Sequence, residues 1–273
     1  MRRCRLWSGV ILVLASVQLP AAPPAGPSWR ERPDWAALFD AAGVPGTLVV
    51  VDRRDDRHWV HDHERAQRRY LPASTFKIPH TLFALDADAA LTPDSQFAWD
   101  GTERSFAAWN RDHSLRSAYA HSAVWVYQEL ARRIGLARER AYLRRIGYGN
   151  ADPGGGLTQF WLTGALRISA FEQIGFLQRL YDEALPFDRE DQRTVKDIML
   201  LERGDGWTLH AKTGWAFDVE PQIGWYVGWV GRDGGAVFFA LNIDMPDGAG
   251  DVGKRTQIVR AALASIGALP PAQ

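Results

Sequence analysis

The chain has 273 residues, of which 46% are hydrophobic, and its formal net charge is zero. That length and composition suffice for one large domain or for two closely packed lobes. The balance of 32 basic and 32 acidic residues argues against a nucleic-acid binder, because such proteins neutralise phosphates with a surplus of Lys and Arg. The single cysteine, Cys4, lies in the N-terminal leader, so the rest of the sequence provides no disulfide and no cysteine metal site.

The N-terminus has the pattern of a secretory signal peptide. Arg2, Arg3 and Arg5 precede an apolar run at 6–19, and small residues follow that run. The run is short for a helix that spans a bilayer, although an uncleaved membrane anchor stays an alternative. The expected division of the chain is a signal peptide at 1–22, a proline-rich connector at 23–33 and one domain at 34–273.

The domain is expected to begin with a short helix at 34–42. Residues 46–52 are apolar and mostly β-branched, which predicts a buried strand, and residues 57–60 can pair back on it as a hairpin. A helix is predicted to follow Ser74. Pro79 falls in its second turn, where a proline removes a backbone donor and kinks or tightens a helix.

Residues 82–201 are predicted to form a mostly helical lobe with long loops. Apolar residues recur at helical spacing from Ser122 to Ile134, so we expect Ser122 to open a helix there. A further helix begins at Ser169, where Glu172 three residues later completes a capping box. The helices predicted after position 134 span 138–146, 169–181 and 191–199.

Strands return after the helical lobe. They are predicted at 207–213, at 223–230, where apolar residues alternate, and at 236–244, which is continuously apolar; a closing helix follows at 254–266. The N-terminal strand can join this C-terminal antiparallel meander. The sequence therefore predicts an α+β fold of two lobes, an antiparallel sheet flanked by helices with a helical lobe inserted between its strands. A cleft between the lobes is the natural place for a binding site.

The most informative stretch is Ser74-Thr75-Phe76-Lys77, because a Ser-x-x-Lys places its two polar side chains on one helical face. A serine hydroxyl is a weak nucleophile until a nearby group takes its proton. A lysine can take it when burial lowers the lysine pKa, and the apolar neighbours Phe76 and Ile78 indicate such a setting. Ser74 is thus the candidate nucleophile and Lys77 the candidate base, although an ordinary serine-capped helix gives the same pattern.

Four further motifs fall where a serine acyl-transfer site would need them. They are Ser122-Ala123-Val124 at a helix start, Tyr148-Gly149-Asn150 in a turn, Lys212-Thr213-Gly214 at a strand end before Trp215, and Arg255 in the first turn of the last helix. Each motif alone can be explained as a cap, a turn, a strand end or a solvated arginine. Their order and spacing together make coincidence a poor explanation.

Ser-x-x-Lys and Lys-Thr-Gly are two of the three motifs of penicillin-recognising serine enzymes, and the Ser-Asp-Asn motif is missing. Ser122-x-Val124, Tyr148-Gly149-Asn150 and Phe160-Trp161 are present instead. With these motifs the chain resembles the class D, oxacillinase-type serine β-lactamases over nearly all of its mature length. The resemblance implies a serine β-lactamase, penicillin-binding transpeptidase-like fold. It also implies hydrolysis of penicillin-type antibiotics and resistance to them.

The resemblance implies a role for each motif. Ser74 is the acylated residue, and Lys77, carrying CO2 as a carbamate (N6-carboxylysine), is the base of acylation and deacylation. An indole N–H is a donor only, so Trp161 suits that anion better than an ammonium, and Val124 removes a polar partner.

The resemblance also implies roles at the substrate. The backbone N–H groups of Ser74 and Trp215 form an oxyanion hole, and Ser122, near Lys212, transfers a proton. Thr213 and Arg255 bind the substrate carboxylate, and Gly214 lets the substrate lie close to the strand. Tyr148 and Asn150 shape the cleft.

The same resemblance implies no metal and no cofactor apart from the CO2 or bicarbonate that modifies Lys77. It implies that the protein is exported across the inner membrane to the bacterial periplasm and acts on a small β-lactam. It implies no binding of nucleic acid and no membrane association after leader cleavage, and a homodimer stays open.

The histidine cluster at 58–64 lacks zinc-site spacing and is interpreted as a solvated hairpin, and His121 is interpreted as structural. Two other functions stay open: a penicillin sensor that is acylated without turnover, and a D,D-peptidase.

Overall fold

The structure is a computed structural model that describes residues 28–271. Within these residues a seven-stranded sheet has the order β1-β3-β2-β9-β8-β7-β6. Its strands are β1 Arg30–Glu31, β2 Gly46–Asp52, β3 Arg57–His61, β6 Leu200–Gly204, β7 Trp207–Ala216, β8 Ile223–Arg232 and β9 Gly235–Asp244. Neighbouring strands run antiparallel except β1, which pairs in parallel with β3. The expected signal peptide, residues 1–22, lies outside the described residues.

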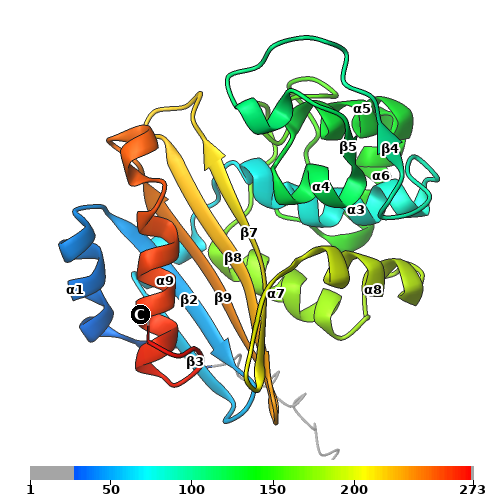
Figure 1. Cartoon of the computed structure of the whole chain (residues 1–273). Coiled ribbons are helices and arrows are strands. Elements are labelled where there is room, and N and C mark those ends of the chain that lie inside the picture. The colour runs from blue at the N-terminus through cyan, green and yellow to red at the C-terminus, as the bar shows by residue number, and fades with distance from the viewer. Residues whose placement is uncertain (1–27, 272–273) are drawn as a thin grey trace, which may run out of the picture.

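Helices cover both faces of the sheet and build the second lobe (Figure 1). They are α1 Pro33–Ala42, α2 His63–Gln67, α3 Lys77–Asp86, α4 Leu115–Ala120, α5 Val124–Ile134, α6 Leu136–Ile146, α7 Ala170–Tyr181, α8 Arg189–Ile198 and α9 Lys254–Ser265. Helices α1 and α9 lie on one face, and α7 packs on the other face against β2 and β9. Helices α3 to α6 form the lobe beside the sheet, together with the small pair β4 Gln96–Phe97 and β5 His113–Ser114.

The predicted α+β fold is confirmed. The hairpin expected after the first helix is β2 and β3, and every residue of β2 is buried, as a strand covered on both faces requires. Helix α7 begins with the expected capping box, in which Glu172 N donates to Ser169 Oγ at 3.2 Å and Ser169 N donates to Glu172 Oε2 at 2.9 Å. Strand β1 was not expected, because its two residues fall inside the predicted connector.

Two local predictions near the candidate site were wrong. The Lys212-Thr213-Gly214 motif does not end a strand, because β7 stays paired with β8 as far as Ala216. Helix α5 begins at Val124 and not at Ser122, whose φ of 54° is left-handed and cannot belong to a right-handed helix. Pro79 is the third residue of α3, and the turn before α3, Ala73–Phe76, is a tight 3-10 helix.

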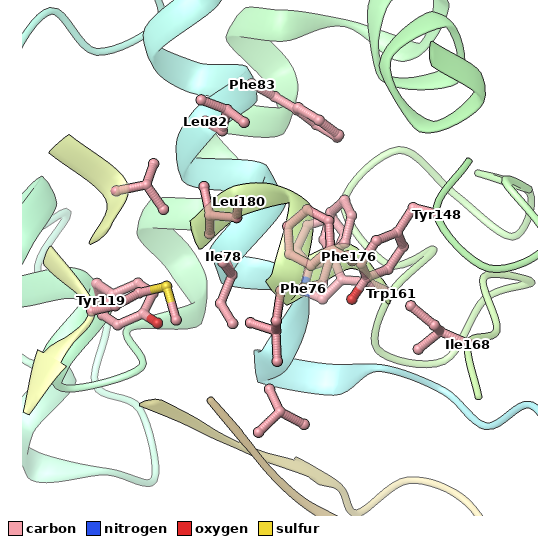
Figure 2. Packing of buried hydrophobic residues seen from close by; sticks show 14 of the residues in the cluster. Phe76, Ile78, Leu82, Phe83, Tyr119, Tyr148, Trp161, Ile168, Phe176 and Leu180 are labelled. Carbon is pink, nitrogen blue, oxygen red and sulfur yellow. The ribbon is translucent and has the colours of Figure 1, made fainter. Parts of the chain in front are cut away.

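Buried apolar side chains form two clusters on opposite faces of the sheet. One lies between the sheet and α1 and α9, and the other continues from the sheet through α7 into the helical lobe. Figure 2 shows part of the second cluster, with Phe76, Tyr148, Trp161 and Phe176 gathered beside α3. The two lobes therefore share one core, which fixes α3 relative to β7. No helix within residues 28–271 is long and apolar enough to cross a membrane.

Candidate active site

Ser74 and Lys77 lie in one tight turn. Residues Ala73–Phe76 form a 3-10 helix that continues directly into α3. Side chains three positions apart eclipse in such a helix, which brings the two polar groups together. Lys77 Nζ is 3.0 Å from Ser74 Oγ. Ala73, just before the serine, has a left-handed φ of 47°, a strained conformation that persists only where the surroundings hold it.

The Lys77 amine is wholly buried, with an exposed fraction of 0%. Burial lowers the pKa of Lys77 well below its ordinary value, and the positive charge of Lys212 lowers it further. Nζ lies 4.9 Å from the centroid of the Tyr127 ring. Burial therefore favours the neutral form of this amine, which is the form that can accept a proton.

Trp161 packs against the same turn. Its carbonyl accepts a hydrogen bond from Ala73 N at 3.0 Å, and its ring centroid lies 5.7 Å from that of Phe76. The indole Nε1 is buried and has no hydrogen-bond partner among the described residues. A buried donor left unpaired is costly, and a carbamate oxygen on Lys77 is an acceptor that an ammonium is not. These residues fit a carbamylated lysine.

A cavity of about 190 Å³ opens in front of Ser74. Seven of its lining residues were predicted from the sequence: Ser74, Ser122, Val124, Thr213, Gly214, Trp215 and Arg255. It lies between β7 and the turn that precedes α5, which is the expected cleft between lobes. The left-handed φ of Ser122 places this residue in that turn, outside the helix.

Strand β7 forms the wall opposite Ser74. Gly214 permits close packing, since a Cβ there would lie 3.0 Å from Pro72 O and 3.1 Å from Thr75 Cγ2. Arg255 Nη1 donates to Gly214 O at 2.6 Å and Nε donates to Val252 O at 2.9 Å, which fixes the guanidinium at the cavity. Burial lowers the pKa of Arg255 to about 10, so the group is still a cation at neutral pH. This wall suits an anionic group of a ligand.

Lys212 is buried behind this wall and does not line the cavity. Its Nζ donates to Thr213 O at 3.1 Å and lies 5.6 Å from the centroid of the Tyr119 ring. Burial, followed by the charge of Arg255, lowers the pKa of Lys212 to about 7. A lysine with that pKa can both hold and release a proton near neutral pH.

Tyr148 and Asn150, expected to shape the cleft, do not line the cavity. The Tyr148 ring packs edge-on against Phe76, at 5.7 Å between centroids. Asn150 Nδ2 donates to Ala165 O at 2.8 Å, and its Oδ1 accepts from Arg167 N at 2.9 Å. Asn150 therefore holds the 165–167 segment that follows Trp161, and Tyr148 packs on Phe76, whose ring contacts that of Trp161.

Other lining residues were not selected from the sequence. They are Phe106, Trp109, His121, Leu162, Phe217 and Val252. Phe106 and Trp109 lie at a short 3-10 helix, Ala107–Trp109, which is too short to leave a periodic pattern in the sequence. His121, interpreted as structural, faces the cavity and also has Nε2 at 2.7 Å from Arg111 Nη2. Within residues 28–271 no group of three or more His, Cys, Asp or Glu is arranged to hold a metal ion.

Comparison with known proteins places this site in a family. A family model described as the penicillin binding protein transpeptidase domain matches residues 46–264. The chain is 54% identical to β-lactamase OXA-3 of Pseudomonas aeruginosa over 244 residues, 89% of this chain and 87% of that protein. It is 42% identical to β-lactamase OXA-48 of Klebsiella pneumoniae over 256 residues, 94% and 95% of the two chains.

Solved structures agree with the sequence relatives. The class D β-lactamase FUS-1 (OXA-85) of Fusobacterium nucleatum subsp. polymorphum superposes with a TM-score of 0.85 at 37% identity, over 88% of this chain and 100% of that one. The class D β-lactamase YbXI from Nostoc gives a TM-score of 0.83 at 38% identity, over 86% and 99%. With Ser74 and Lys77 meeting at one cavity, these matches show that the chain belongs to the class D β-lactamases, a family of serine hydrolases.

Proposed function

We propose that this enzyme hydrolyses the β-lactam ring of penicillin-type antibiotics through an acyl-Ser74 intermediate and so confers resistance to them. One observation carries the proposal: a wholly buried lysine amine lies 3.0 Å from a serine hydroxyl at the wall of a cavity. The relatives named as β-lactamases supply the substrate class.

In acylation, Lys77 in its carbamylated form is assigned to accept the Ser74 proton as Oγ attacks the lactam carbonyl carbon. The backbone N–H groups of Ser74 and Trp215, both at the cavity, are assigned to the oxyanion that forms. When the ring C–N bond breaks, the lactam nitrogen takes a proton from Ser122. Lys212, whose pKa is about 7, resupplies that proton to Ser122.

In deacylation, water must lose a proton while it attacks the ester carbonyl of acyl-Ser74. With CO2 bound to its amine, Lys77 would supply an anionic base that takes this proton and returns it to Ser74 Oγ as the ester bond breaks. Trp161 is assigned to hold this group through its unpaired indole N–H, and the apolar Val124 keeps competing polar groups away. Lys77 thus serves both half-reactions, and no separate cofactor or metal is needed.

Substrate binding is assigned to the β7 wall. A guanidinium suits a planar carboxylate, and Arg255 stands at the cavity beside Thr213, so these two residues are proposed to hold the carboxylate of the β-lactam. Gly214 lets the substrate lie close to the strand. Tyr148 and Asn150 are proposed to act indirectly, by supporting the segment that carries Trp161.

We also propose that the enzyme acts in the bacterial periplasm as the single domain 34–273, after removal of residues 1–22. The basic and apolar pattern of the leader supports this location. N-terminal sequencing of protein released from the periplasm checks the cleavage point. Size-exclusion chromatography with light scattering distinguishes a monomer from a homodimer.

Turnover of a chromogenic cephalosporin tests the proposal. The enzyme should show sustained hydrolysis, and bicarbonate should restore activity lost at acid pH. A single burst equal to the enzyme concentration would instead identify a penicillin sensor. Cleavage of a D-Ala-D-Ala peptide without β-lactam turnover would identify a D,D-peptidase. Ser74→Ala is the negative control, because it removes only the nucleophile's oxygen.

A further inference from the structure

A buried polar pair that the proposed reaction does not use lies one helical turn beyond Lys77. His80 of α3 and Glu139 of α6 both have an exposed fraction of 0%. His80 Nε2 lies 2.8 Å from Glu139 Oε1. The contact lacks hydrogen-bond alignment, and neither side chain has a hydrogen-bond partner among the described residues. Buried polar groups without hydrogen bonds are costly to a fold, so this pair beside the active site requires an explanation.

The His80 ring contacts the aromatic residues around Lys77. Its centroid lies 5.3 Å from the Trp161 ring at an interplanar angle of 63°, and 5.0 Å from the Phe76 ring. It also lies 5.6 Å from the Tyr127 ring, over which Lys77 Nζ is placed. His80 therefore stands behind both rings that face the modified lysine in the proposed function.

The two rings differ in what fixes them. The Tyr127 hydroxyl is 2.8 Å from Thr81 Oγ1, so a hydrogen bond orients that ring. The Trp161 indole has no hydrogen-bond partner among residues 28–271, so only packing orients it. The aromatic rings that pack on it are Phe76, Phe160 and His80. Of these three rings only His80 has a polar side chain against it, with Glu139 Oε1 at 2.8 Å.

We infer that His80, fixed by Glu139, is a positioning residue that orients the Trp161 indole N–H for a carbamate on Lys77. The inference rests on the proposed function. Without this support the indole ring can rotate out of its donor position, which weakens its hydrogen bond to the carbamate. The affinity for CO2 then falls, while the Ser74 nucleophile and the β7 wall are unchanged.

The test measures bicarbonate dependence in three variants. His80→Leu/Glu139→Leu removes ring and charges together and leaves no unpaired charge, so the chain should fold. It should raise the half-saturating bicarbonate concentration at least about tenfold, weaken the 13C NMR carbamate signal in 13C-bicarbonate, and recover kcat at saturating bicarbonate. Glu139→Gln keeps size and a polar contact and should stay close to the parent enzyme.

Gln192→Leu is the matched control. Gln192 is also wholly buried and polar, but its side chain bonds to the 183–187 turn near α8. It should change thermal stability without changing bicarbonate dependence. An unshifted bicarbonate dependence and full carbamate signal in the double variant would overturn the inference. A parent enzyme with neither carbamate signal nor bicarbonate dependence would overturn the proposed function itself.

Discussion

At the residue scale, burial sets the chemistry of the two active-site lysines. The chain carries only four lysines among its 32 basic residues, and two of them, Lys77 and Lys212, are buried at one site. Removing an ammonium from water lowers its pKa, which is the direction for both groups. Lys212, whose pKa falls to about 7, is thereby able to exchange protons near neutral pH, and the neutral form of Lys77 is favoured.

Trp161→Phe tests the indole donor at this scale. The change keeps an aromatic ring and removes only the N–H, so the proposed carbamate on Lys77 loses its donor. We expect deacylation to slow by about 100-fold or more, as for loss of one preorganised donor, with acyl-enzyme accumulating in a stopped-flow burst. Trp35→Phe is the control, because Trp35 is equally buried but lies on α1, on the far face of the sheet. Unchanged deacylation would contradict the assigned role.

Lys212 gives a pH prediction. Burial lowers its folded-state pKa from 10.5 to about 7, so between these values the unfolded chain binds the proton and the folded chain does not. The stability contributed by this group therefore rises with pH across that window. We expect Lys212→Met to be more stable than the parent at pH 6 by roughly 3–5 kcal/mol, with the difference shrinking towards pH 10.

Thermal melts of Lys212→Met and the parent over this pH range check the prediction. Bicarbonate-free buffer keeps Lys77 unmodified, so that no added charge changes the environment of Lys212. The variant should also lose turnover, since the proposed proton supply to Ser122 is gone. A difference in stability that does not depend on pH would show that Lys212 is not the titrating group.

At the element scale, the distance between β7 and the Ser74 turn decides the width of the site. These elements come from distant parts of the chain, and Gly214 faces the turn closely, since an added Cβ would lie 3.0 Å from Pro72 O. Arg255 then links β7 to the start of α9 through Gly214 O. The site is thus assembled by three elements that a shared core holds in place.

Gly214→Ala tests this close approach. The added methyl would lie 3.0 Å from Pro72 O and 3.2 Å from Trp225 Cβ, so β7 must move away from the nucleophile. We expect kcat/KM to fall by about tenfold or more, since small displacements of reacting groups are costly, with the fold retained. Gly175→Ala is the control. Gly175 lies inside α7, and a Cβ added there would have no atom within 4 Å outside the nearby helix backbone, so the change should stabilise the enzyme by about 1 kcal/mol. Unaltered kinetics in Gly214→Ala would show that a methyl group at position 214 fits without displacing β7.

At the scale of the whole molecule, the two lobes share one apolar core. The cluster that contains Leu130 of α5 also contains Phe238 of β9, and α7 lies between lobe and sheet. A lobe that shares its core cannot unfold alone without exposing that core to water. The helical lobe and the sheet should therefore unfold together.

A pair of core truncations tests cooperativity. Leu130→Ala leaves a cavity in the helical lobe, and Ile258→Ala leaves one beneath α9. Each change should lower the free energy of unfolding by about 2–5 kcal/mol. Calorimetry should show one transition for both variants, with matching calorimetric and van't Hoff enthalpies. Two separated transitions, with only one of them shifted by each variant, would contradict a common folding unit.

The sequence by itself determined the longer helices and strands and the reactive side chains available to the site. The continuous apolar run of β2, the alternation in β8 and the helical spacing in α9 marked these elements closely, because burial on two faces or on one leaves that pattern in the residues. The Ser74 and Lys77 pair was predictable because it is local, three positions apart. The capping box of α7 was predictable for the same reason.

Only the tertiary structure decided what depends on contacts between distant segments. Periodicity does not report a left-handed φ at Ser122 or the continuation of β7 to Ala216, since partner strands and packing impose both. It also did not reveal that Tyr148 and Asn150 do not line the cavity, or that His80 meets Glu139. Residues far apart in sequence have no local pattern in common, so their pairing appears only once the fold brings them together.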